Sequence, residues 1–250
     1  MTGFRRAERL AGIELSEIVA ISERASRLRA EGRDILSLST GEPDLPTPPH
    51  VVEAAHRAAR DGMTTYPPTA GIADLRSAIG ALYEVPATRT VVSTGAKQVI
   101  ANAMLATLDT GSEVIMPAPY WTSYSDIVRM CGGVPVVIAC PMAQGFKLAS
   151  LQLDAAITPH TRWLVLYSPS NPWGDFYAFP SVAGLLAETG GRFEDDAHLC
   201  TWLLDEAGVA VVPWRAFNLA GHLRLPFTDS EATIAKGNAR MDRAMEGVAA

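Results

Sequence analysis

The fold is decided at one junction, where the stretch SPSNPWG at residues 168–174 runs directly into DFYAFP at residues 175–180. Before this junction, predicted strands alternate with predicted helices, which is typical of a parallel sheet with helices on both faces. The predicted strands are 90–93, 113–116, 135–139 and 162–167, and the helices are 97–108, 122–130 and a short one from Ser150. After the junction the alternation stops. The junction therefore predicts the boundary between an α/β core and a smaller α+β part.

Local signals also predict the elements outside this core. Ser16 followed by Glu17 and a periodic apolar pattern indicates a capped amphipathic helix that ends at Gly32. Two prolines at 48 and 49 begin a second helix, because proline is tolerated in the first helical turn. The remaining predicted elements are the strands 35–39, 176–179, 209–212 and 222–227, and the helices 72–83, 195–207 and one from Ser230.

This order of elements predicts three parts. An N-terminal arm with part of a small domain covers residues 1–45, a reduced α/β large domain covers 46–174, and a C-terminal small domain covers 175–250. A chain of 250 residues with 48% hydrophobic residues is long enough to bury a core of this kind.

Composition excludes several classes of function. The net charge is −6 and no dense run of Lys or Arg occurs, so nucleic acids and anionic membranes are not expected as partners. No apolar run reaches the length of a membrane span, and no signal peptide is recognisable, which predicts a cytoplasmic protein. The five histidines show no metal-binding spacing, so no metal site is expected. The three cysteines form no CxxC pair and are expected to be reduced.

The junction also carries a resemblance to a known family. SPSNP followed by a glycine resembles the asparagine loop of class I aminotransferases, the fold-type-I pyridoxal phosphate enzymes of the aspartate aminotransferase kind. FYAFP resembles the start of that family's small domain. The resemblance extends in the family's order from about Ile13 to the C-terminal helix. It implies a reduced fold-type-I architecture, an α/β fold with a parallel or mixed sheet flanked by helices and a small α+β C-terminal domain.

The resemblance implies a binding site for the cofactor phosphate. Tyr66 in YPPTAG matches the tyrosine that reaches the phosphate of the neighbouring subunit. Gly95, Ala96 and Lys97 in STGAKQ match the phosphate-binding loop, which places backbone amides at a helix N-terminus, where the helix dipole favours an anion.

The resemblance also implies a binding site for an amino acid. Gly41 in TGEPD matches the glycine whose amide approaches the substrate carboxylate. Trp121 in APYWTSY matches the aromatic residue that stacks on the pyridine ring. Asn171 matches the asparagine that donates to the cofactor's phenolic oxygen and lies near the substrate. Arg224 in HLRLPF matches the arginine that binds the α-carboxylate, because a planar guanidinium can donate two parallel hydrogen bonds to a carboxylate.

Two motifs of the family do not occur in the sequence. SDEIY supplies the aspartate under the pyridine nitrogen, and FSKxxxMTGxR supplies the lysine that bonds the cofactor. Without them we expect a repurposed enzyme that binds a small amino acid or related carboxylate and needs no lysine-bound pyridoxal phosphate. Its reaction would be a cyclisation, elimination, hydrolysis or isomerisation, with no cofactor expected. Asp175, Tyr177 and His222 are the candidates for proton transfer.

Two alternatives remain open at this point. The chain could be an inactive paralogue that binds a ligand or pairs with a full-length aminotransferase, or an enzyme that binds pyridoxal phosphate without a covalent bond. Losing strands from the sheet would leave an exposed edge, which invites association. A homodimer is therefore expected.

Overall fold

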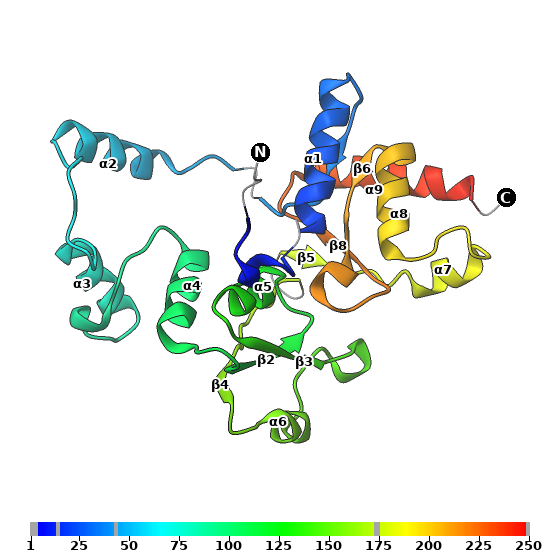
Figure 1. The fold of residues 1–250 in the computed structure, drawn as a ribbon. Coiled ribbons are helices and arrows are strands. Elements are labelled where there is room, and N and C mark those ends of the chain that lie inside the picture. Colours follow the sequence, from blue (N-terminus) through cyan, green and yellow to red (C-terminus); the bar gives the residue numbers. More distant parts are fainter. Residues whose placement is uncertain (1–4, 14–15, 43–44, 173–175, 249–250) are drawn as a thin grey trace. The chain divides into compact units, whose positions relative to one another are not determined.

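The computed structural model describes residues 5–13, 16–42, 45–172 and 176–248. The chain divides into two compact units, of which one comprises Met1–Asp44 with Leu108–Ala250 and the other comprises Leu45–Thr107 (Figure 1). None of the helices in the described ranges is both long enough and apolar enough to cross a membrane.

The larger unit contains a three-stranded parallel sheet. β2 (Glu113–Ala118) lies between β3 (Val134–Ala139) and β4 (Thr161–Leu164). The connections run through α5 (Ser123–Met130) and α6 (Ser150–Ala156). They cross the sheet in opposite directions, and right-handed crossovers then place the two helices on opposite faces (Figure 1). The central strand is covered on both sides, and its residues Val114, Ile115 and Met116 are fully buried.

A second set of strands follows the junction. β8 (Leu223–Pro226) lies between β5 (Tyr177–Ala178) and β7 (Val212–Pro213) in an antiparallel sheet. β1 (Leu36–Ser37) pairs in parallel with β6 (Val209–Ala210), so the N-terminal segment joins the C-terminal part. The helices of this region are α1 (Glu17–Ala30), α7 (Ala183–Glu188), α8 (Asp196–Trp202) and α9 (Glu231–Glu246).

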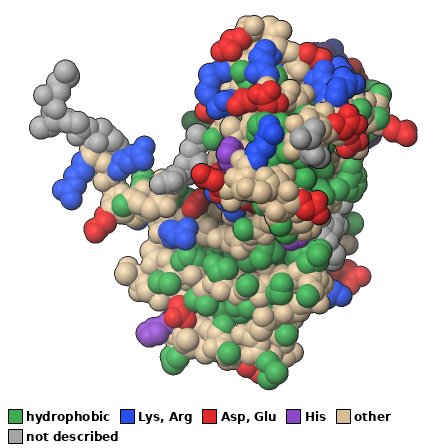
Figure 2. All heavy atoms as spheres, turned by 90° about the vertical axis from the view of Figure 1, so that its right-hand side faces the viewer, with side chains coloured by type: hydrophobic (Ala, Val, Ile, Leu, Met, Phe, Trp, Pro, Cys, Tyr) green, Lys and Arg blue, Asp and Glu red, His purple; other side chains and the backbone are tan. Residues whose placement is uncertain are grey.

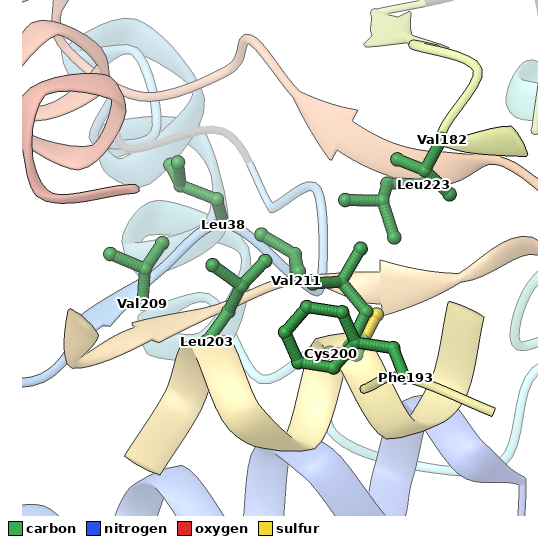
Figure 3. Packing of buried hydrophobic residues seen from close by; sticks show 9 residues of the cluster. Leu38, Val182, Phe193, Cys200, Leu203, Val209, Val211 and Leu223 are labelled. Carbon is green, nitrogen blue, oxygen red and sulfur yellow. The ribbon is translucent and has the colours of Figure 1, made fainter. Parts of the chain in front are cut away.

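One hydrophobic core joins these distant segments. Leu38 packs into the same cluster as residues from the last seventy residues of the chain (Figure 3). The other buried members are Val182, Phe193, Leu199, Cys200, Leu203, Val209, Val211 and Leu223. In Figure 3, Cys200 of α8 lies between Phe193, which precedes the helix, and Leu203, which follows it, and Val209 and Val211 come from the segment of β6 and β7 beside them. The core therefore holds β8 and the segment after β1 in fixed positions.

The surface of the molecule is divided by polarity. On the face shown in Figure 2, hydrophobic side chains gather in the lower half and charged side chains in the upper half. Both outer strands of the parallel sheet, β3 and β4, keep one edge unpaired in the described residues. On β3, Val134 and Val137 are exposed to 47% and 43%. An exposed apolar edge of this kind is a surface on which another chain can pair.

The smaller unit contains three helices, α2 (Pro49–Arg60), α3 (Ala73–Leu82) and α4 (Ala96–Thr107). Among its residues, all of which are described, Met104 is the one large hydrophobic side chain that is fully buried. Many others are exposed, including Leu45 at 81%, Leu82 at 73% and Tyr83 at 69%. The unit therefore buries too little apolar surface to stabilise itself as an independent domain.

The strand predicted at 90–93 is wrong, since the structure forms no strand there. The backbone groups of this segment have other partners. The Thr90 carbonyl accepts a hydrogen bond from Arg76 Nε at 2.8 Å, and the Val92 amide donates to the Ala70 carbonyl at 3.0 Å. The predicted helix 195–207 forms as α8 followed by a π-helical turn at Leu203–Ala207, and α7 was not predicted.

Candidate functional site

A buried arginine forms the centre of the candidate site. Arg224 on β8 is 2% exposed. Its Nη1 donates to Asn171 Oδ1 at 3.2 Å, and its Nη2 donates to the Ser39 carbonyl. Its Nε is buried and has no hydrogen-bond partner among the described residues. A buried cation with an unused N–H is costly unless an anion binds it. The guanidinium therefore has the properties of a receptor for a carboxylate.

Two aromatic rings hold this guanidinium. Its central carbon lies 4.4 Å from the ring centroid of Tyr177 and 5.0 Å from that of Phe217. Both distances allow attraction between the cation and the negative face of a ring. Desolvation by burial lowers the pKa of Arg224 to about 10, which still leaves the group charged at neutral pH. The rings fix the arginine in one orientation, from which it presents its remaining N–H groups.

Gly41 belongs to the same cluster. Its backbone has φ +67°, in the left-handed region. A Cβ at this position would lie 2.5 Å from the Tyr177 hydroxyl oxygen and 2.6 Å from Tyr177 Cε1. Glycine is required here both by its conformation and by this close approach. Gly41, Tyr177, Arg224 and Asn171, which the sequence nominated separately, are thus connected through direct contacts.

Tyr167 and Ser39 were not nominated from the sequence, although both contact this cluster. The Tyr167 hydroxyl donates to the Asn171 carbonyl at 2.5 Å and accepts from the Trp121 amide at 3.0 Å. Desolvation by burial raises the pKa of Tyr167 well above its usual value. The signal that could have found it is its position directly before SPSNP. A tyrosine at the end of an apolar strand usually needs a partner for its hydroxyl.

Trp121 lies just before α5 and is half-buried. Its ring meets Tyr124 edge-on, with centroids 5.3 Å apart, and Tyr124 meets Tyr167 at 5.4 Å. The three rings contact one another in a row that begins with Trp121, three residues beyond the carboxyl end of β2. Ligands of α/β proteins bind outside this end of a parallel sheet.

The three candidates for proton transfer have different surroundings. Tyr177 packs on Arg224, as described above. His222 packs edge-on against Trp214 at 4.3 Å, and its Nε2 is buried without a hydrogen-bond partner in the described ranges. Asp175 lies outside the described residues. Their catalytic roles stay predictions.

The loop nominated for phosphate binding lies in the smaller unit. Gly95 directly precedes α4, has φ +151° and has no atom within 4 Å of where a Cβ would be. Ser93 Oγ and the Thr94 amide bond to Gln98 Oε1 at 3.0 and 3.4 Å, which closes the loop. Ala96 and Lys97 are exposed at the start of the helix. Amides of a first helical turn lack partners within the helix and fit a phosphate.

Tyr66 of the same unit is fully exposed, with a relative exposure of 102%. Its contact with a phosphate of a neighbouring subunit stays a prediction. Within the described part of the protein, no group of three or more His, Cys, Asp or Glu side chains could hold a metal ion.

The fold and this site define a class of protein: an α/β fold that contains a buried arginine with an unused N–H and, in its smaller unit, a helix N-terminus preceded by an open glycine loop. Comparison with known families agrees, since the family model for aminotransferase class I and II matches residues 33–187. The chain belongs to the class I and II aminotransferase family.

Relatives of known sequence carry aminotransferase names. The chain is 47% identical over 192 residues to the aspartate aminotransferase of Rhizobium meliloti, and this match covers 74% of the chain and 46% of that enzyme. It is 45% identical over 186 residues to the aspartate/prephenate aminotransferase of Cereibacter sphaeroides, with 72% and 46% covered. The chain therefore spans about half the length of these curated relatives.

Solved structures show the same fold. The crystal structure of the aspartate aminotransferase from Rhizobium meliloti matches with a TM-score of 0.84 and 27% identity, covering 98% of this chain and 99% of that one. The aspartate aminotransferase of Thermus thermophilus with maleate matches with a TM-score of 0.84 and 25% identity, covering 96% and 100%. The predicted fold class is confirmed.

These relatives contradict the prediction of a repurposed enzyme that acts without lysine-bound pyridoxal phosphate, and with it the expectation of no cofactor. The relatives are named as aminotransferases, and the family is one of pyridoxal phosphate enzymes. The prediction gave the missing lysine and aspartate motifs more weight than the residues that are present. A missing segment does not change the chemistry of the residues that remain.

Proposed function

We propose that this chain binds a dicarboxylic amino acid and pyridoxal phosphate for transamination, as an aminotransferase of the aspartate kind. The observation that carries the proposal is the buried Arg224 with an unpaired Nε, held by two rings and joined to Asn171. No other charged side chain among the described residues combines this degree of burial with an unused donor.

The residues present fit the cofactor in part. The loop of Gly95, Ala96 and Lys97 offers amides and open space to a phosphate, and Trp121 offers an aromatic wall to a planar ring. When bound, pyridoxal phosphate supplies the electron sink through which an amino group moves between an amino acid and a 2-oxo acid.

The chain's own residues supply binding and orientation. Arg224 and Asn171 would bind the α-carboxylate, and the backbone at Gly41 would bring an amide close to it. Of the three lysines, Lys236 forms an ion pair with Asp34 at 3.1 Å, Lys147 lines a cavity of about 490 Å³ beside Tyr167, and Lys97 belongs to the phosphate loop. The family's lysine motif does not occur in the sequence, so we assign the covalent bond to the cofactor to none of these three lysines.

A homodimer is part of the proposal. Its support is the smaller unit, which exposes Tyr66 and buries little apolar surface, and the unpaired edges of the parallel sheet. Light scattering should give twice the chain's mass of 26.7 kDa at micromolar concentration. A complex that forms only after a full-length aminotransferase is added would favour hetero-association instead. The predicted location is the cytoplasm.

Calorimetric titration with maleate tests the carboxylate site. The wild type should bind maleate, and Arg224→Met should weaken binding about tenfold to a hundredfold, because charged hydrogen bonds contribute about 1.5–3 kcal/mol. Methionine fills a similar volume but leaves Asn171 Oδ1 and the Ser39 carbonyl without this donor, so urea unfolding of the variant must show that it is folded under the conditions of the titration. The matched control is Arg162→Met on β4, an exposed arginine. Equal binding by the wild type and Arg224→Met would refute the proposed site.

Fluorescence titration with pyridoxal phosphate tests the phosphate loop. Gly95→Ala should weaken binding, because φ +151° is rarely adopted by residues with a Cβ. Gly62→Ala is the control in the same unit, with φ +83° and no atom within 4 Å of its Cβ position. Inorganic phosphate should compete with the cofactor in the wild type. Unchanged binding by Gly95→Ala would contradict the assignment of this loop.

A further inference from the structure

One hydroxyl group connects the loop that contains Trp121 to the loop that contains Asn171. Tyr167 lies three residues beyond the end of β4. Its hydroxyl accepts a hydrogen bond from the Trp121 amide at 3.0 Å and donates to the Asn171 carbonyl at 2.5 Å. The Pro119 carbonyl is a weaker second acceptor at 3.5 Å. Two loops that are far apart in the sequence are thus joined at a single atom.

The hydrogen bond from Tyr167 to the Asn171 backbone also affects the Asn171 side chain. Asn171 Oδ1 accepts from Arg224 Nη1 at 3.2 Å, which leaves the amide NH₂ as a donor for a ligand. The orientation of this donor depends on where the Asn171 backbone is held. The Asn171 carbonyl is held by Tyr167, so the hydroxyl of Tyr167 sets the position from which the amide acts.

Tyr167 is suited to this task. A phenol can donate one hydrogen bond and accept another, and both capacities are used here. Burial raises the pKa of Tyr167, so the group stays a neutral phenol at physiological pH and keeps its donor. Its ring is braced edge-on by Tyr124 at 5.4 Å.

We propose that Tyr167 is a positioning residue for carboxylate binding: its hydroxyl ties the Trp121 loop to the Asn171 loop and so orients the Asn171 amide beside Arg224. The inference rests on the proposed function, because it concerns the same carboxylate. Tyr167 itself acts through Asn171 and needs no contact with the ligand.

The neighbouring tyrosine provides a matched control. Tyr124 is half-buried like Tyr167, packs against the same rings, and makes no side-chain hydrogen bond in the described part of the chain. Tyr167→Phe and Tyr124→Phe therefore remove the same atom from neighbouring positions while keeping both rings. Only the first removes a hydrogen-bonded hydroxyl.

The test is a double-mutant cycle with maleate as the probe. Tyr167→Phe should weaken maleate binding about threefold to tenfold, the effect of losing one neutral hydrogen bond, and Tyr124→Phe should leave it unchanged. In the Asn171→Ala background, Tyr167→Phe should have no further effect, because both changes act through the same amide. A purely structural role would give the same loss in both backgrounds and would overturn the proposal.

Amide hydrogen exchange gives a second, independent readout. In Tyr167→Phe the Trp121 amide should exchange faster, while the amides within α5 keep their protection. Unchanged exchange at Trp121 would overturn the proposal even if the variant were less stable. If the wild type binds maleate and Tyr167→Phe binds it equally well, the inference fails and the proposed function stands. If the wild type binds no maleate, both fail.

Discussion

Replacing Gly41 with alanine should damage both stability and carboxylate binding. The new methyl group destabilises the folded state through two separate energetic terms, one for the backbone conformation and one for steric contact. Gly41 has φ +67°, and the left-handed region costs a residue with a Cβ about 1–2 kcal/mol. In addition, the Cβ would lie 2.5–2.8 Å from three atoms of Tyr177, a separation at which something must move.

The second term is large because Tyr177 has little freedom to move. Its ring is 7% exposed and lies against the Arg224 guanidinium at 4.4 Å. Insertion of a methyl group into a packed site costs about 1–3 kcal/mol. The two terms together predict a loss of about 2–5 kcal/mol in the free energy of unfolding. Any shift of the ring would also displace the arginine and weaken maleate binding.

Gly32→Ala separates the two terms. Gly32 has φ +89° in the same unit, and no atom lies within 4 Å of its Cβ position. This control should lose only the conformational term of about 1–2 kcal/mol and bind maleate normally. Urea unfolding measures both losses, provided that the slope of the transition does not change. If Gly41→Ala were no less stable than Gly32→Ala, the close approach between Gly41 and Tyr177 would be wrong.

Three further predictions follow from burial and capping. The affinity for maleate should be constant from about pH 8 to about pH 9 and should fall as pH rises through about 10, where Arg224 loses its charge. A Kd that stays constant well above this pH would contradict the lowered pKa. Trp214→Ala should lower the free energy of unfolding by about 3–5 kcal/mol, because Trp214 is fully buried between Phe146 and Phe179. A loss below about 1 kcal/mol in urea unfolding would contradict this tight packing around Trp214. Ser230→Ala should lower the free energy of unfolding by about 1 kcal/mol, because Ser230 Oγ accepts a hydrogen bond from the Thr233 amide at the start of α9. An unchanged midpoint of urea unfolding would show that this cap does not stabilise the helix.

The resemblance and the site illustrate different limits of prediction. Arg224, Asn171 and Gly41 could be nominated because short strings around them resemble the family. Tyr167 and Ser39 lie directly before two of these strings but were missed, because the strings do not show that the residue before them reaches the cluster. Phe217 was missed because it reaches Arg224 from a segment without such a string. The expectation of no cofactor was wrong because it relied on motifs that are missing from the chain. The residues that are present pointed to the family of the aspartate aminotransferases.

Elements with local signals could be predicted from the amino-acid sequence alone. The prolines at 48 and 49 predicted the start of α2, and apolar runs predicted β2 and β3. Capping and periodicity act within a few residues, so they can be recognised in a single sequence.

Strand pairing and the surroundings of Arg224 became visible only in the folded chain. The stretch 90–93 has a strand-like composition, but its backbone bonds to Arg76 and Ala70 instead of to another strand. Likewise, the Arg224 guanidinium is held by Ser39, Asn171, Tyr177 and Phe217, which come from four separate segments. Strand pairing and the burial of a charge depend on partners distant in the chain, and no local pattern specifies those partners.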